Sequence, residues 1–94
     1  MNYVKIIKKQ ILPILRKNKI KKAGLFGSCA RGEAKKGSDV DLLVSLPKGA
    51  SLLDFIGIKQ ELEDVLGTEV DLVEYRAIKK SLRQKILSEQ VSVL

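Results

Sequence analysis

Residues 27–44, GSCARGEAKKGSDVDLLV, decide how this chain folds and which ligand it can hold. They place a glycine-serine turn, Gly27 and Ser28, a short loop ahead of two aspartates, Asp39 and Asp41, that open an apolar run. Glycine allows a ligand to approach the backbone closely, and N–H groups at the start of a helix bind phosphate. Carboxylate oxygens bind divalent cations. The stretch therefore predicts a site for a nucleoside triphosphate and its magnesium ion.

Carboxylates from two predicted strands supply the cation site. Side chains two apart on a strand share a face, so Asp39 and Asp41 project together, while Val40, Leu42 and Val44 turn toward the packed side. Two carboxylates so close repel each other unless a cation adds positive charge. Asp71 lies in a further apolar run, TEVDLVEY, and is the candidate third ligand or base. Three carboxylates can hold two magnesium ions, one on the triphosphate and one activating an attacking hydroxyl.

The phosphate side of the site has its own candidates. Ser28 can donate both its N–H and its hydroxyl to phosphate oxygens, and Arg31 can add positive charge. Each feature alone also has a structural interpretation, because glycine-serine pairs are common in turns and strand-entry aspartates are often solvated. For Arg31 alone, an ion pair with Glu33 or a helix carboxylate is favoured. The combination of the turn with three carboxylates favours the phosphate site.

Hydrophobic periodicity around this stretch predicts an α+β chain with α/β-type alternation. The expected elements are a helix at 2–17 that Pro13 kinks or breaks, strands at 20–26, 40–46 and 68–75, a short helix after Ser28, helices at about 51–66 and 78–88, and an edge strand at 91–94. The packed sides of the last two helices are expected to comprise Leu52, Phe55, Ile56, Leu62, Val65 and Leu66, then Ile78, Leu82 and Ile86. Helices are therefore expected to layer on a small sheet.

Length and composition indicate one soluble globular domain over residues 1–94. The chain is 45% hydrophobic and 31% charged, as in ordinary globular proteins. No apolar run approaches the roughly 20 residues that span a bilayer. Lysines interrupt the N-terminal apolar positions, so no secretory signal is expected. These features predict a cytoplasmic protein without a membrane anchor.

Missing residue types exclude several chemistries. The chain has no histidine and a single cysteine, Cys29, so it can form neither an internal disulfide nor a Cys-rich zinc site. Ser-His-Asp, Cys-His and HExxH mechanisms are excluded as well. Catalysis by this chain is therefore expected to use carboxylates, bound metal or the backbone.

The net charge of +7 is concentrated in both ends of the sequence. A lysine-rich solvated exterior accounts for most of it, although a polyanionic ligand or an acidic partner surface would also suit it. The last predicted helix is basic and could contact RNA. Only two Tyr and two Phe are present, and none alternates with basic residues, so base stacking has weak support.

The motifs together resemble a known signature. Gly27-Ser28, then ARGEA at 30–34 and GSDVDLLV at 37–44, resemble the DNA polymerase beta-like nucleotidyltransferase superfamily, and most closely its minimal nucleotidyltransferases, MNT. The resemblance covers nearly the whole chain. It implies a mixed sheet flanked by helices. It also implies transfer of a nucleoside monophosphate from a triphosphate to an acceptor hydroxyl, with release of pyrophosphate.

The same resemblance assigns roles by matching position. Gly27 and Ser28 would hold the triphosphate, Asp39 and Asp41 would bind magnesium, and Asp71 would complete the triad and help to deprotonate the acceptor. ATP is the substrate that the family implies.

A partner is implied too. Minimal members are often antitoxins of HEPN-domain ribonucleases, and some attach AMP to a tyrosine of the toxin. AMP transfer from ATP to a HEPN toxin is thus the expected function. Two alternatives stay open. One is a non-catalytic antitoxin that binds nucleotide and blocks its toxin sterically, and the other is a nucleotidyltransferase acting on a small molecule or an RNA end.

Overall fold

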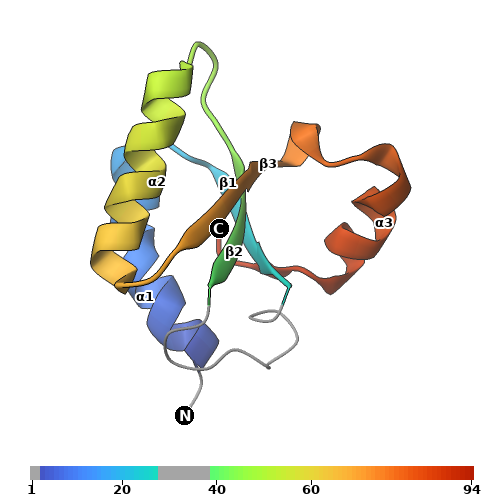
Figure 1. Cartoon of the computed structure of the whole chain (residues 1–94), viewed down its shortest axis with the longest axis horizontal. Coiled ribbons are helices and arrows are strands. Elements are labelled where there is room, and N and C mark those ends of the chain that lie inside the picture. The colour runs from blue at the N-terminus through green and yellow to red at the C-terminus, as the bar shows by residue number, and fades with distance from the viewer. Residues whose placement is uncertain (1–2, 28–38) are drawn as a thin grey trace.

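Figure 1 shows a computed structural model of the chain, which describes residues 3–27 and 39–94. From Val40 onward, strands alternate with helices, as the hydrophobic periodicity predicts. The elements are, in order, α1 (Tyr3–Lys17), β1 (Lys22–Phe26), β2 (Val40–Ser45), α2 (Leu52–Leu66), β3 (Val70–Glu74), the short 3-10 helix η1 (Tyr75–Ala77), α3 (Lys80–Glu89) and β4 (Val91–Ser92). The short helix predicted after Ser28 lies outside the described residues.

The four strands form one mixed sheet in the order β3-β2-β1-β4. β2 pairs in parallel with β3, whereas β1 pairs antiparallel with both β2 and β4. The edge strand predicted at the end of the chain is confirmed, because β4 adds to the free side of β1. β3 forms the opposite edge. The predicted fold class, a small mixed sheet flanked by helices, is confirmed.

Helices α1 and α2 cover one face of the sheet (Figure 1). Alternate residues of β2 point into this layer, as predicted, and the neighbouring strands contribute the residues in register with them. Burying one such side chain stabilises the fold by about 1.5–3 kcal/mol. The buried residues of this layer are Ile7, Ile11 and Leu15 of α1, Ile20 before β1, Ala23 and Leu25 of β1, Val40, Leu42 and Val44 of β2, Ile58 and Leu62 of α2, Val70 and Leu72 of β3, and Val93 after β4.

Pro13 does not break α1. The helix continues through it to Lys17, which confirms the predicted end, and of the two alternatives predicted at Pro13 the early break does not occur. Proline removes one intrahelical hydrogen bond, and here it lies on the exposed side of the helix. Water can therefore satisfy the carbonyl that loses its partner, while the buried side of α1 still packs on the sheet.

The first strand begins later than the sequence predicts, at Lys22. Residues before it complete the end of α1 instead: Lys19 adopts a φ of 60°, and the N–H of Ile20 donates to the Leu15 carbonyl at 2.9 Å. Ile20 is buried, which explains its apolar character, but it packs from a turn rather than from the strand.

Both predicted ends of α2 are confirmed. Ser51 accepts a hydrogen bond from the Asp54 N–H, and the Asp54 carboxylate accepts one from the Ser51 N–H, which makes a capping box. At the other end, Gly67 adopts a φ of 68° and its N–H donates to the Glu63 carbonyl. Glycine is favoured there because other residues are strained at positive φ.

The packed side of α2 is rotated from the prediction. Ile58 and Leu62 are its buried residues, and Phe55 and Leu66 pack partly against them. Leu52, Ile56 and Val65, which were expected in the core, are 73%, 43% and 44% exposed. A helix with apolar residues on several sides has no single direction that its sequence selects, so the contacting sheet decides which side is buried.

The last helix also packs less than predicted. α3 begins at Lys80 and contains no buried residue, and it lies on the side of the sheet away from α1 and α2 (Figure 1). Ile78 is buried, but it precedes the helix, and Leu82 is 48% exposed. The low apolar content of α3 explains the difference, since frequent charges leave no continuous apolar stripe. No helix in the described part of the chain is long and apolar enough to cross a bilayer.

The capping box can be tested by substitution. Ser51→Ala should lower the free energy of unfolding by about 1 kcal/mol, because the Asp54 N–H loses its acceptor. Ser81→Ala, at an exposed position inside α3, should leave it unchanged or slightly raise it, since alanine is the better helix former. Urea denaturation of both variants measures the difference, and equal effects would contradict the cap assignment.

Candidate active site

The predicted acidic residues meet on the face of the sheet that α1 and α2 leave uncovered. Asp41 of β2 is the direct register partner of Asp71 in β3 and of Phe26 in β1. Asp39 immediately precedes β2 and so lies at the same end of the sheet. Register partners share a face at a strand spacing of about 4.8 Å. The fold therefore brings together three carboxylates that are up to 32 positions apart in the sequence.

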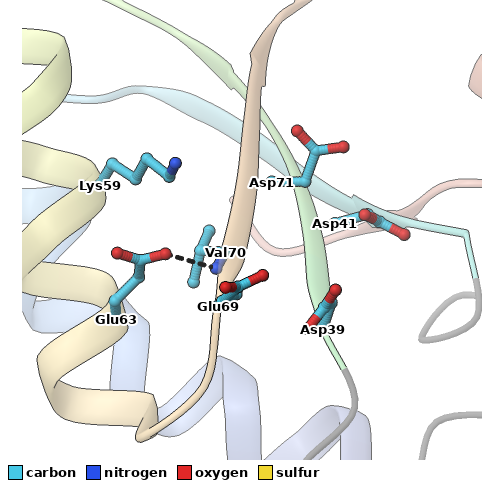
Figure 2. Close-up of a pocket in the computed structure, with 7 residues that line it drawn as sticks. All are labelled: Asp39, Asp41, Lys59, Glu63, Glu69, Val70 and Asp71. Atoms are coloured by element: carbon cyan, nitrogen blue, oxygen red, sulfur yellow. Dashed lines mark hydrogen bonds between the residues drawn. The ribbon is translucent and has the colours of Figure 1, made fainter.

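These carboxylates line one cavity of about 520 Å³ (Figure 2). Asp39 and Asp71 are exposed and Asp41 is half-buried, so the cavity opens to solvent. Carboxylates dominate the lining, which gives it a negative potential that attracts cations. The residues that complete the lining are Lys59, Glu63, Glu69 and Val70.

Gly27 ends β1 directly beside the Asp41 carboxylate. Its φ is 65°, and a Cβ atom built on it would run into Asp41 Oδ2. Two separate constraints thus exclude a side chain here: the left-handed backbone and the space that the carboxylate occupies. Close approach of a phosphate to Gly27 stays a prediction, and the group that lies against this glycine in the structure is Asp41.

The donor set fits a magnesium site. Asp39, Asp41 and Asp71 present hard carboxylate oxygens, which magnesium prefers. As their side chains are placed, no group of three or more acidic, histidine or cysteine residues within 3–27 and 39–94 stands close enough to hold one ion together. Because Asp39 and Asp71 are exposed, their carboxylates can change rotamer to approach an ion beside Asp41. Ser28 and Arg31, predicted for the phosphates, lie outside the described residues.

Comparison with known proteins assigns the family. A family model described as "Nucleotidyltransferase domain" matches residues 8–93. The chain belongs to this family. The similarity to nucleotidyltransferases proposed from residues 27–44 is thereby confirmed, and the chain is an enzyme of the nucleotidyltransferase type.

Named relatives of this nucleotidyltransferase are protein adenylyltransferases. "Putative protein adenylyltransferase MJ0435" of Methanocaldococcus jannaschii is 51% identical over 88 residues, which cover 94% of this chain and 95% of the relative. "Protein adenylyltransferase MntA" of Thermococcus cleftensis is 45% identical over 74 residues, or 79% of this chain and 75% of the relative. A crystal structure of a toxin-antitoxin with AMP-PNP is similar with a TM-score of 0.78 and 27% identity, covering 93% of this chain and 72% of that one.

Asp71 was predicted from the sequence, but Glu69, which forms a second pair of carboxylates with it in the nucleotidyltransferase cavity, was not. Glu69 precedes β3 as Asp39 precedes β2, and the Val40 N–H donates to the Glu69 carbonyl at 3.0 Å. The motif Asp-x-Asp at 39–41 therefore lies beside Glu-x-Asp at 69–71. The repeated acidic spacing at the start of two strands was the available signal.

Two residues of α2 also reach this cavity without having been predicted. The Val70 N–H donates to Glu63 Oε2 at 3.0 Å, which fastens the start of β3 to the helix (Figure 2). Lys59, one turn earlier, is the cation among the residues that line the cavity. Their four-residue spacing puts them on one side of α2, but only the position of β3 identifies that side.

Away from the acidic cavity, Tyr75 and its contacts cover part of the sheet face that α1 and α2 leave uncovered. The Tyr75 hydroxyl donates to Gln90 Oε1 at 2.7 Å, and both side chains lie over Gly24, where a Cβ atom would collide with Gln90. Lys22 Nζ lies 4.5 Å from the Tyr75 ring centroid. Burial raises the pKa of the Tyr75 phenol, so it stays protonated and remains a donor. The acidic end of the face is thus left as its accessible part.

Gly27→Ala tests the crowding at Asp41. Gly67 is a matched control, because its φ is almost the same and nothing lies within 4 Å of a Cβ atom built there. Each substitution should cost about 1–2 kcal/mol of unfolding free energy through backbone strain. Gly27→Ala should cost more, since it also displaces the Asp41 carboxylate. Chemical denaturation measures both, and equal losses would contradict the contact.

Proposed function

We propose that this nucleotidyltransferase is a magnesium-dependent protein adenylyltransferase. It transfers AMP from ATP to a hydroxyl group on a protein, specifically a tyrosine of a HEPN-domain toxin, and so acts as that toxin's antitoxin in the cytoplasm. The whole of residues 1–94 serves as one catalytic domain. The observation that supports this proposal is the register pairing of Asp41 with Asp71 beside Gly27, at an exposed acidic cavity.

Two kinds of similarity support the choice of nucleotide and acceptor. The relatives named above are adenylyltransferases that act on proteins. The similar toxin-antitoxin structure contains AMP-PNP, an analogue of ATP. The HEPN identity of the toxin and its tyrosine acceptor come from the resemblance of residues 27–44 to minimal nucleotidyltransferases.

The transfer follows from the roles of the chain's own groups. Asp39 and Asp41 would hold magnesium, with Asp71 as a third ligand, while Gly27 and Ser28 would hold the triphosphate. Bound magnesium supplies positive charge to the phosphates and lowers the barrier to attack by an oxygen nucleophile. Asp71 accepts the proton of the tyrosine hydroxyl as its oxygen bonds to the α-phosphorus, and pyrophosphate leaves. Positioning and electrostatics therefore carry the reaction, without a covalent enzyme intermediate.

One observation favours a second candidate function, that of an antitoxin that binds nucleotide but does not catalyse transfer. The three aspartates are not gathered into a ready-made cation site in the described part of the chain. A nucleotide-binding antitoxin that blocks its toxin by occlusion would need no such site. This candidate predicts that toxin neutralisation survives the loss of Asp39 and Asp41.

Asparagine substitutions separate these candidates. Asp39→Asn and Asp41→Asn should each lower AMP transfer to the HEPN-domain toxin by about a hundredfold or more, because the metal loses a charged ligand. Asp64→Asn is the control, since Asp64 is exposed on α2 outside the cavity. Labelled ATP and mass spectrometry of the toxin measure transfer, and circular dichroism checks folding. Transfer by Asp41→Asn at the parent rate would refute the metal role.

Asp71 can be distinguished from the other two by steady-state kinetics. If it accepts the acceptor's proton, Asp71→Asn should lower kcat by about 10²–10⁴-fold while leaving the KM for ATP within a few fold of the parent value. Glu69→Gln, at the neighbouring exposed carboxylate, should change kcat much less. A large rise in the KM for ATP with unchanged kcat would instead assign Asp71 to substrate binding.

A further inference from the structure

One edge of the sheet leads directly to the acidic cavity. β3 is an edge strand, and its inner side bonds to β2. Because the Glu69 carbonyl accepts from the Val40 N–H, backbone alternation points the groups of residues 69, 71 and 73 toward β2. The backbone N–H and C=O groups of Val70, Leu72 and Glu74 therefore point outward. An edge of this kind is a template for another strand.

The outward edge is only partly occupied. Glu63 accepts the hydrogen bond of the Val70 N–H, next to the cavity. Within residues 3–27 and 39–94, no hydrogen bond is made by the outward N–H groups of Leu72 and Glu74. The open part of the edge thus begins beside Asp71 and ends where η1 begins at Tyr75.

One side of α2 forms a wall along this edge. Leu52, Ile56, Lys59 and Glu63 recur at helical spacing and share that side. Glu63 bonds to the start of β3, whereas Leu52 lines a cavity of about 290 Å³ with Glu74 and Arg76 at its end. The wall therefore follows β3 along its whole length. We call the space between this side of α2 and the edge of β3 the edge groove.

Apolar exposure in the edge groove is high. Leu52 is 73% exposed and Ile56 is 43% exposed, although both face a strand edge with open hydrogen-bonding groups. An exposed apolar side chain beside unpaired backbone groups suits an extended peptide, which offers N–H and C=O groups and alternating side chains. The backbone of a nucleic acid has no N–H and C=O groups at strand spacing, and the carboxylates of Glu63, Glu69 and Asp71 along the way would repel its phosphates.

Register fixes where a guest strand would place its side chains. Phe26, Asp41 and Asp71 form one row across β1, β2 and β3 on the uncovered face. A strand added to β3 would supply the next position of this row, about 4.8 Å from Asp71, and its side chain would point to the same face. Its two neighbours in the guest would point to the other face, toward α2.

We propose that the edge groove docks an extended segment of the acceptor protein as a fifth strand. The residue that carries the acceptor hydroxyl lies opposite Asp71, and the guest residues opposite Leu72 and Glu74 pack on Ile56 and Leu52. Glu63 ends the pairing at Val70, so the hydroxyl residue sits at the mouth of the cavity. This inference rests on the proposed function, because it assumes that a protein hydroxyl receives AMP.

Charge substitutions on α2 test the docking. Leu52→Glu and Ile56→Glu should each raise the KM for the HEPN toxin by about tenfold, equivalent to about 1.4 kcal/mol, and leave the KM for ATP unchanged. Leu53→Glu is the matched control: it is 79% exposed in the same helical turn but points away from β3. All three positions are exposed, so thermal unfolding should be nearly unchanged. Equal effects of Leu52→Glu and Leu53→Glu would overturn the proposal.

Amide hydrogen exchange gives a readout that does not depend on catalysis. Binding of the toxin in the absence of ATP should slow exchange at Leu72 and Glu74 by about tenfold or more, because a guest strand pairs with these N–H groups. Unchanged exchange in a complex confirmed by gel filtration would overturn the edge groove. Slowing that depends on the concentration of this chain alone would assign the edge to a second copy, and would overturn it too.

Assays of the unsubstituted enzyme distinguish a failure of the proposed function from a failure of the edge-groove proposal. If the parent transfers AMP to the toxin and the edge variants do so with parent kinetics, only the edge groove is refuted. If the parent transfers no AMP to the toxin, the proposed function is refuted, and so is the docking of the acceptor in the edge groove.

Discussion

The parallel pairing of β2 with β3 is the constraint on which the rest of the molecule depends. It sets Asp41 beside Asp71 at strand spacing, where two like charges repel unless a cation or solvent screens them. The apolar residues between these aspartates hold the pairing in register, because a slip of one residue would bury the carboxylates and expose the core. The helix that connects the two strands, α2, is fixed at both ends by the Ser51 capping box and Gly67. Packing of the apolar residues on one face of the sheet thus keeps Asp41 and Asp71 together on the opposite face, although their charges repel.

The two faces of the sheet differ in role: one carries the buried core that stabilises the fold, and the other carries the acidic cavity. No polar or charged side chain is buried among the described residues, and the layer under α1 and α2 is purely aliphatic. The opposite face is closed over Gly24 by Tyr75 and Gln90 and is open at its acidic end. Substitutions at the acidic end should therefore alter chemistry with little loss of stability, since exposed groups contribute little to folding. This separation makes the asparagine variants interpretable.

The predictions made from the sequence were correct where one strong local signal decides the structure. The apolar run after Asp39, the helix stop at Gly67 and the facing of Val40 and Leu42 were all predicted, because strand alternation and capping are properties of neighbouring residues. The buried side of α2 was not predicted, since its apolar residues occur on several sides and only contact with the sheet selects Ile58 and Leu62. Lys59 and Glu63 were missed for the same reason, because they join the site through tertiary contact, whereas Glu69 had a local signal in the acidic spacing that repeats at 39–41 and 69–71. The roles of Asp39, Asp41 and Asp71 stay predictions.

The pairing of β4 with β1 has a consequence for the order of folding. Leu25 pairs with Val91, so two strands at opposite ends of the chain must meet before the sheet is complete. Such contacts between distant positions carry a large loop-closure entropy and form slowly. The loop that pairing of β2 with β3 closes is shorter, so the acidic strands can come together first. Tyr75 gains its partner Gln90 only when the last segment packs. A folding chain therefore holds its acidic strands together before it closes the remainder of that face.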